Sequence, residues 1–164
     1  MMKKQNLYLE TSVFGFCFDE DFHNREKRAC TETLFRQVSQ GLFEGFASDV
    51  VLRELQETSD PELRAALKNL VEPLHILPAR QEEDVNYLCS LYIENGAVPA
   101  EMFDDALHVA LVVTNPDIDV LVSWNCRHIV NTNVKMKLRG LTEKAGYKFG
   151  FEIATPAEVI FYEV

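Results

Sequence analysis

The 164 residues of the chain, 47% of them apolar and 26% charged, predict one globular domain over residues 1–164 with a core of its own. No stretch approaches the ~18 uninterrupted apolar residues of a membrane span, and the basic first residues are not followed by the long apolar region of a secretion signal. Nucleic-acid binders usually carry net positive charge on their binding surface, whereas this chain has a net charge of −10, so any nucleic-acid chemistry requires local positive charge.

The four cysteines, Cys17, Cys30, Cys89 and Cys126, are scattered along the chain without paired spacing. This pattern predicts free thiols in a reducing cytosol rather than a zinc site or a disulfide framework. We therefore expect a cytoplasmic protein that does not contact a membrane.

Short apolar runs predict strands at residues 7–9, 43–47, 74–77, 119–123 and 149–153, and Pro78 closes the third. Between them lies a polar and aromatic connection at residues 16–24, followed by stretches that predict helices. These are residues 25–40, 50–56, 60–71, 81–95, 100–114 and 133–145, with a short last helix opened by Thr155-Pro156. Gly41, Gly96 and Gly146 are expected to end three of the helices.

Strands that alternate with helices predict parallel strands joined by right-handed crossovers. We therefore expect an α/β fold, namely a three-layer α/β/α sandwich with a mostly parallel central sheet of about five strands. Neither an internal repeat nor a linker divides the sequence.

The first predicted strand ends in Glu10, Thr11 and Ser12. In open α/β sheets, ligands bind outside the carboxyl ends of the strands, so this acid and its two hydroxyl neighbours are candidate site residues. The alternative is that the three residues form only a polar turn. Glu54, in the helix after the second strand, either points over the same edge of the sheet or is an ordinary exposed acid.

Two adjacent acids, Asp104 and Asp105, begin an otherwise apolar helix. The helix dipole favours acids in the first turn, which accounts for one of them. Adjacent helical residues point about 100° apart, so one acid can face the sheet edge while the other faces water. His108, three residues after Asp105, is expected to be a hydrogen-bonded structural residue rather than a metal ligand.

The fourth predicted strand is followed by Asn125, which can donate or accept hydrogen bonds but carries no charge. Arg127 nearby could bind a phosphate group. The alternative is a turn that closes the strand, with Trp124 packed on the sheet.

Four segments of the chain resemble the PIN-domain family, and most of all its VapC-like toxins from type II toxin–antitoxin pairs. They are YLETSVFG at residues 8–15, SDVVLREL at 48–55, DALHVA at 105–110 and LVSWNCRHI at 121–129. The resemblance implies a Mg²⁺- or Mn²⁺-dependent ribonuclease that hydrolyses phosphodiesters. By motif position its acidic residues are Glu10, Glu54 and Asp105, with Asn125 at a fourth catalytic position that is often acidic and Asp104 as an extra neighbour.

Two residues depart from the pattern of that family. Glu10 stands where Asp is usual, and its extra methylene moves the carboxylate by ~1.5 Å, although functional sites tolerate only about 0.5 Å. Mg²⁺ needs near-octahedral ligands at ~2.1 Å, so either the side chain folds back or the metal shifts. Asn125 removes one negative charge from a second metal position, so the sequence favours one bound metal over two.

In the implied mechanism, Glu10 and Asp105 hold the metal, which activates water and neutralises charge on the phosphate. Glu54 completes the metal ligands or orients the nucleophile, and Thr11 or Ser12 binds a ligand water or the substrate. Binding of RNA requires positive charge on the protein, and Lys135, Lys137 and Arg139 could supply it along the phosphate backbone of the RNA. The alternative is that these three basic residues lie on a solvated helix surface.

The resemblance also implies a small antitoxin partner and a homodimer. A different function is that of a catalytically weak or inactive PIN-fold module that binds RNA or protein, which the Glu10 and Asn125 departures favour. A phosphatase with an aspartyl nucleophile is disfavoured, because that chemistry needs Asp after the first strand and a partner lysine.

Overall fold

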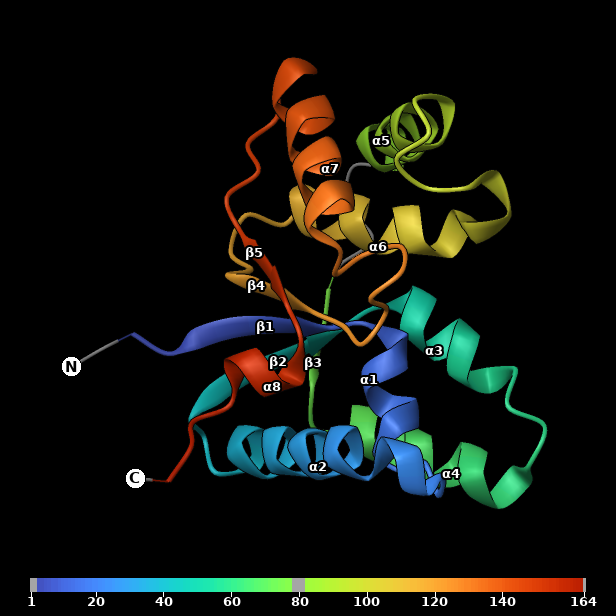
Figure 1. The fold of residues 1–164 in the computed structure, drawn as a ribbon, viewed down its shortest axis with the longest axis vertical. Helices are drawn as coiled ribbons and strands as arrows, with labels where there is room; N and C mark the ends of the chain where they lie inside the picture. The colour runs from blue at the N-terminus through green and yellow to red at the C-terminus, as the bar shows by residue number, and fades with distance from the viewer. Residues whose placement is uncertain (1–2, 78–81, 164) are drawn as a thin grey trace.

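A computed structural model describes residues 3–77 and 82–163, which form an α/β fold around one parallel five-stranded sheet (Figure 1). The order across the sheet is β3-β2-β1-β4-β5, with β1 in the centre. Register pairs Tyr8 with Phe46 on one side of β1 and Leu9 with Val122 on the other. The strands are β1 (Gln5–Leu9), β2 (Phe43–Ala47), β3 (His75–Ile76), β4 (Val120–Val122) and β5 (Glu152–Ala154). The expected three-layer architecture with parallel strands is confirmed.

The central strand is buried on both faces, which explains its continuous apolar run. Leu7, Tyr8 and Leu9 have no exposed surface, as is typical of the interior strand of a parallel sheet covered by helices on both sides. β2 and β4 pair with opposite edges of β1. The order in which strands are added therefore reverses at β1, with β2 and β3 on one side and β4 and β5 on the other. The carboxyl ends of β1 and β4 therefore flank a topological switch point, where α/β proteins bind ligands.

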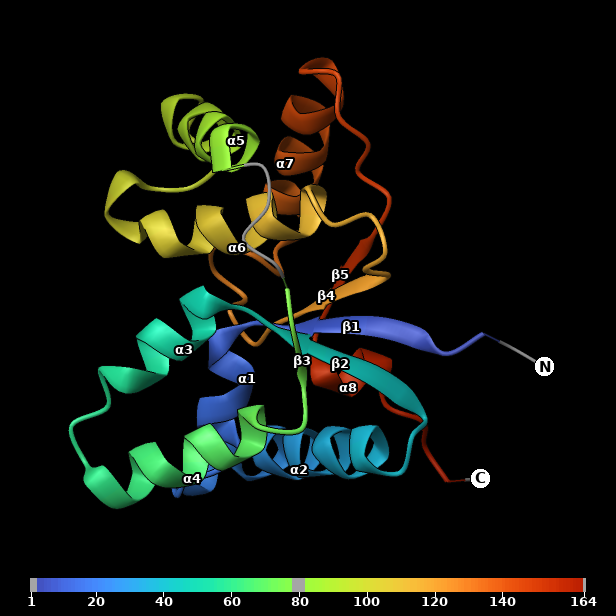
Figure 2. The ribbon, with the colours of Figure 1, turned by 180° about the vertical axis from the view of Figure 1, so that it is seen from behind.

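Helices cover both faces of the sheet (Figure 1 and Figure 2). One layer holds α1, α2, α4 and α8, and the other holds α5, α6 and α7, while α3 lies beside the carboxyl end of β1 and contacts both α4 and α6. The helices are α1 (Thr11–Phe16), α2 (Arg25–Ser39), α3 (Asp49–Gln56), α4 (Pro61–Val71), α5 (Glu82–Glu94), α6 (Phe103–Val113), α7 (Thr132–Lys144) and α8 (Pro156–Val159). Two short 3₁₀ helices, η1 (Phe22–Asn24) and η2 (Ala100–Met102), precede α2 and α6.

Local capping signals in the sequence fix several helix ends. Ser48 caps α3 by accepting a 3.3 Å hydrogen bond from the Val51 amide, and Pro61 stands at the start of α4. Gly41, Gly96 and Gly146 follow α2, α5 and α7 with φ values of 79°, 71° and 95°, a left-handed backbone that glycine adopts without strain. The three predicted helix ends are therefore confirmed.

The prediction was wrong where the chain leaves β1. Residues 11–16 form α1, although the sequence predicted no helix between the first strand and the connection over 16–24. Burial of Val13 and Phe14 stabilises this short helix. Other differences are small: the first turn of the helix expected at 100–114 is 3₁₀, and β5 begins at Glu152 rather than at residue 149.

Two further predictions, the closure of the third strand by Pro78 and the start of a helix at Gln81, lie outside the described residues. Within residues 3–77 and 82–163, no helix has both the length and the apolar composition required to cross a bilayer.

Candidate functional site

The candidate site lies at the switch point beyond the carboxyl ends of β1 and β4. Glu10 directly follows β1 and donates its backbone N–H to Val122 O at 3.0 Å, which extends the pairing with β4 by one bond. Ser123 follows β4. Glu54 comes from α3 and Asp105 from the first turn of α6. We refer to Glu10, Glu54 and Asp105 together as the acidic cluster.

The carboxylate of Glu10 is buried and fully engaged by its neighbours. Only 4% of the surface of Glu10 is exposed to solvent. Oε1 accepts hydrogen bonds of 2.6 Å from the hydroxyl groups of Ser12 and Ser123, and Oε2 accepts one of 3.1 Å from the Ser12 backbone N–H. The last bond makes Glu10 the N-cap of α1. In this cap the Glu10 side chain bends back toward the Ser12 backbone, and this contact fixes the position of a carboxylate that is one methylene further from the main chain than that of aspartate.

Glu54 points toward the same edge of the sheet, as the functional interpretation of its position required. Its Oε1 atom accepts a 2.7 Å hydrogen bond from the hydroxyl of Thr11 and lies 2.6 Å from Nε2 of His108. Glu54 is therefore not an ordinary exposed acid, because two buried or half-buried groups from other elements bind its carboxylate.

His108 connects two members of the acidic cluster. It is completely buried, and its Nε2 atom lies 2.6 Å from Glu54 and 3.9 Å from Oε2 of Glu10. Burial by itself lowers the pKa of His108, but the hydrogen bond with Glu54 and the negative charges of Glu10, Glu54 and Asp105 outweigh burial and raise the pKa above its ordinary value. The expectation of a hydrogen-bonded histidine is confirmed.

The carboxylate of Asp105 is held by His128, which lies in the segment after β4. Its Oδ2 atom lies 3.1 Å from Nδ1 of His128, and its side chain is only 14% exposed. Burial raises the pKa of Asp105, and the charge of Glu10 raises it further, while the Asn125 side chain and the charges of His108 and His128 lower it. The influence of Glu10 means that the two carboxylates repel each other across the site.

Asn125 organises the segment after β4. Its Oδ1 atom accepts a 2.9 Å hydrogen bond from the His128 backbone N–H, and its own backbone N–H donates to Ser123 Oγ at 2.9 Å. An asparagine that binds backbone further along the chain stabilises a turn. Asn125 thus positions His128, which in turn contacts Asp105.

The remaining predicted residues lie outside the centre of the site. Asp104 pairs with Arg53 of α3 through hydrogen bonds of 2.8 and 3.3 Å, so adjacent Asp104 and Asp105 have different partners. Arg127 is exposed in the segment between β4 and α7. The predicted basic residues lie along α7: Lys135 donates to Ile153 O at 3.2 Å, Arg139 lies 5.4 Å from the centroid of the Phe149 ring, and Lys137 is exposed.

Sequence reasoning missed several groups that support the acids, namely Tyr8, Ser48, Ser123 and His128. The Tyr8 hydroxyl lies 2.7 Å from both Ser48 Oγ and His108 Nδ1. Two signals were available: Ser48 was recognisable as a helix cap, and Ser123 stands at a strand end. Their contacts with Tyr8 and Glu10 depend on tertiary structure.

The donor set of the acidic cluster fits Mg²⁺ or Mn²⁺ in chemistry, because these ions prefer carboxylate oxygens and a cation would relieve the repulsion between Glu10 and Asp105. The protein's own donors engage each of the three carboxylates. Over residues 3–77 and 82–163, no group of three or more His, Cys, Asp or Glu side chains is arranged to hold a metal ion. Metal binding would require the carboxylates to exchange some of their present hydrogen bonds.

The chain matches no protein-family model and no curated protein.

Proposed function

We propose that the chain is a Mg²⁺- or Mn²⁺-dependent ribonuclease of the PIN-domain type. The observation that carries the proposal is the convergence of Glu10, Glu54 and Asp105, which are far apart in the sequence, at the switch point of the sheet. His108 bridges the first two at 3.9 and 2.6 Å, and the charge of Glu10 acts on Asp105. The four sequence segments that resemble the PIN family contain these same acids.

Glu10, Asp105 and Glu54 would hold the metal, with Asn125 at the fourth position. When bound, Mg²⁺ or Mn²⁺ makes a bound water more acidic and neutralises charge on a phosphate group. The residues of the chain orient the acids: Ser12 and Ser123 hold Glu10, Thr11 and His108 hold Glu54, and His128 holds Asp105. These contacts limit the positions of the acids, and metal binding would replace some of them with bonds to the ion.

A cellular role as the toxin of a toxin–antitoxin pair follows from the same resemblance. In this role the substrate is RNA, a small antitoxin protein covers the site, and two copies of the chain associate in the cytoplasm. Pull-down of a co-expressed neighbouring gene product and light scattering of the purified chain test these partners directly.

A second function, a PIN-fold module that binds RNA or protein without cleaving it, is favoured by one specific observation. Every acid of the cluster already accepts hydrogen bonds from the protein, so the folded chain does not need a metal to satisfy these buried groups. In this function the carboxylate of Glu10 caps α1, that of Glu54 joins α3 to α1 and α6, and that of Asp105 joins α6 to the segment after β4.

Calorimetry with Mn²⁺ and an assay of RNA cleavage distinguish the two functions. The ribonuclease should bind Mn²⁺ and cleave RNA, and Asp105→Asn should lose both activities. Asp104→Asn is the matched control, because the same substitution one residue away removes an acid that pairs with Arg53 instead. Absence of Mn²⁺ binding at millimolar concentration, or equal cleavage by both variants, would reject the proposed ribonuclease.

A further inference from the structure

Lys27, in the first turn of α2, lies against two aromatic rings at the side of the candidate site. Its Nζ atom is 5.2 Å from the centroid of the Phe16 ring and 5.6 Å from the centroid of the Trp124 ring. The two rings are in contact, with centroids 5.8 Å apart and planes tilted by 54°. These distances are within the range of cation–π attraction. Lys27 is a half-buried residue, and two rings hold its ammonium group.

Trp124 links the position of Lys27 to the acidic cluster. Its backbone N–H donates to Ser12 Oγ at 2.9 Å, and the same hydroxyl donates to Glu10 at 2.6 Å. At its other end the Trp124 indole N–H donates to Thr31 Oγ1 at 2.8 Å, one turn along α2 from Lys27. Hydrogen bonds from two different N–H groups of Trp124 thus connect this residue both to the hydroxyl that binds Glu10 and to the helix that carries the lysine.

The position of Phe16 in α1 shows on which face of this helix the two rings lie. Phe16 follows Ser12 by four residues, and residues with this spacing lie on the same face of a helix. The ring beneath the lysine and the hydroxyl that binds Glu10 therefore share one face of α1. Lys27 lies beside the site, not on the opposite surface of the helix.

The charge of Lys27 has no carboxylate partner within the described residues, since none of their salt bridges includes it. The adjacent Arg28, in contrast, pairs with Glu32 at 2.7 Å. A cation in the first turn of a helix is also disfavoured by the helix dipole. Helix stability thus does not account for Lys27, whereas an anionic substrate next to the acidic cluster would.

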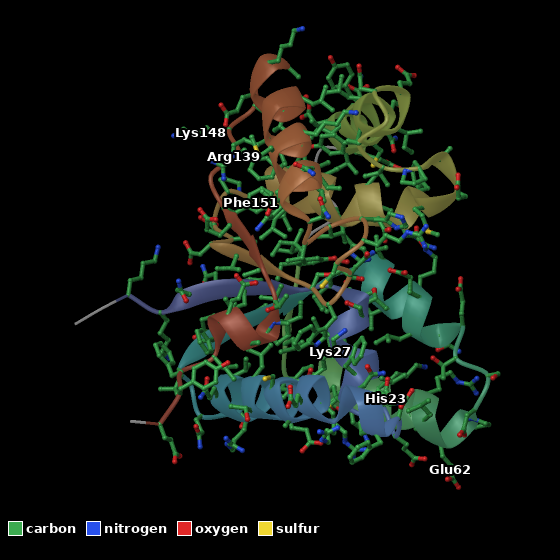
Figure 3. All side chains as sticks on the ribbon, viewed as in Figure 1. His23, Lys27, Glu62, Arg139, Lys148 and Phe151 are labelled. Atoms are coloured by element: carbon green, nitrogen blue, oxygen red, sulfur yellow. The ribbon has the colours of Figure 1, made fainter. Side chains whose placement is uncertain are left out.

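We propose that Lys27 binds a phosphate group of a single-stranded RNA substrate, with Phe16 and Trp124 holding its ammonium group in position. This inference rests on the proposed ribonuclease function and names a substrate contact for it. The net charge of −10 makes such a contact necessary, because a polyanion meets repulsion at an acidic site. Figure 3 shows Arg139 and Lys148 far from Lys27, so these basic residues would contact a different part of the RNA.

The test measures RNA binding by fluorescence anisotropy over a series of salt concentrations. All proteins carry Asp105→Asn, so that a labelled single-stranded RNA is not cut in Mn²⁺ buffer. Lys27→Met keeps an unbranched stem against the rings and removes the charge, while Lys27→Arg keeps the charge and can stack on aromatic rings. Lys3→Met is the matched control, since Lys3 is exposed before β1 and so at the opposite, amino end of the sheet.

We expect Lys27→Met to bind the RNA several-fold more weakly, and its plot of log affinity against log salt to be less steep by about 0.7, the value of one phosphate contact in a single strand. Lys27→Arg and Lys3→Met should keep the original slope. A purely structural role of Lys27 would not change the salt slope. Equal melting temperatures of Lys27→Met and Lys27→Arg would confirm that both variants are folded, and Lys27→Gln replaces the methionine variant if it is not.

Three results would overturn the assignment. If Lys27→Met binds RNA with the original affinity and slope while the wild-type chain cleaves RNA, Lys27 is not a phosphate contact but the ribonuclease proposal stands. If Lys3→Met weakens binding as much as Lys27→Met, the effect comes from total charge and not from this position. If none of the proteins binds RNA and the wild-type chain does not cleave it, both proposals fail.

Discussion

The hydroxyl of Tyr8 and ring atom Nδ1 of His108, which are 100 residues apart in the chain, lie 2.7 Å from each other in the core below the candidate site. The same hydroxyl lies 2.7 Å from Ser48 Oγ, which caps α3. One buried group thus joins β1, α3 and α6. These are the three elements that position Glu10, Glu54 and Asp105, so the arrangement of the acids depends on a hydroxyl whose partners are Ser48 and His108.

We first predict that Tyr8→Phe destabilises the fold and loosens the site. The substitution leaves the buried Ser48 hydroxyl and His108 Nδ1 without this partner, which costs roughly 1–3 kcal/mol for unsatisfied buried polar groups. Chemical denaturation measures the change in the free energy of unfolding. Tyr87→Phe is the control, because Tyr87 is 52% exposed. An unchanged free energy of unfolding in Tyr8→Phe would show that water replaces the lost hydroxyl.

A second prediction concerns the charge of Asp105. Burial and the charge of Glu10 raise the pKa of Asp105, so its carboxylate form is less favourable in the folded than in the unfolded chain. The stabilising effect of a raised pKa is present below the unfolded pKa and is lost as the pH rises through the folded pKa. At about pH 7 that stabilising effect is absent, and the buried carboxylate of Asp105 is repelled by Glu10. Asp105→Asn replaces this carboxylate with a neutral amide and should therefore raise the melting temperature of the chain in EDTA.

The adjacent variant Asp104→Asn provides the comparison. It removes a half-exposed ion pair with Arg53, and exposed pairs contribute only about 0–1 kcal/mol. Its melting temperature should therefore stay the same or fall slightly. A lower melting temperature of Asp105→Asn than of Asp104→Asn would contradict the repulsion that we infer between Asp105 and Glu10.

The sequence predicted the architecture because its signals were local. Apolar runs marked the strands, and glycine and proline marked the helix ends at positions such as Gly96 and Pro61. The position of Glu10 also followed from a general rule, since a residue that directly follows a parallel strand lies at the carboxyl edge of the sheet. The part of the site that depends on chain order and helix direction was therefore predictable.

The parts that could not be predicted depend on tertiary contacts. Val13-Phe14-Gly15 has no helical period and contains a glycine, so α1 forms mainly because Val13 and Phe14 are buried and Glu10 caps it. The direction of Asp104 is set by Arg53, which is 51 residues away in the chain. No local pattern contains this information, and it emerges only when α3 and α6 pack together.

A third prediction concerns the reactivity of the cysteines. Burial, and after it the charge of Asp104, raises the pKa of the Cys89 thiol to about 12, and only the thiolate reacts with disulfide reagents. Ellman's reagent at about pH 8 should therefore react quickly with the exposed Cys126 and not with Cys89. Raising the pH to about 9 should leave Cys89 unreactive, because its thiol remains protonated.

Mass mapping of the modified residues checks this order, and all four thiols should react in denaturant. In Cys126→Ser the fast phase should disappear. Rapid modification of Cys89 in the folded chain would indicate that the core formed by α5 and α6 opens frequently.

The last prediction concerns how the segment after α8 is attached to α2. The buried side chain of Gln37 donates to Phe161 O at 2.7 Å and accepts from the Phe161 N–H at 3.0 Å. The Phe161 ring also stacks on Phe43, with centroids 5.2 Å apart. Gln37→Met keeps the length of the side chain but removes both hydrogen bonds, so we expect a loss of about 1–3 kcal/mol and faster chymotrypsin cleavage after Phe161 or Tyr162.

Gln40→Met is the matched control, because it makes the same substitution at an exposed position just after α2. Its rate of cleavage and its free energy of unfolding should equal those of the wild-type chain. The ring stacking on Phe43 remains in both variants, so the comparison isolates the two hydrogen bonds of Gln37. If Gln37→Met resists chymotrypsin as well as the control does, stacking alone holds the segment in place, and the paired hydrogen bonds contribute little to its attachment.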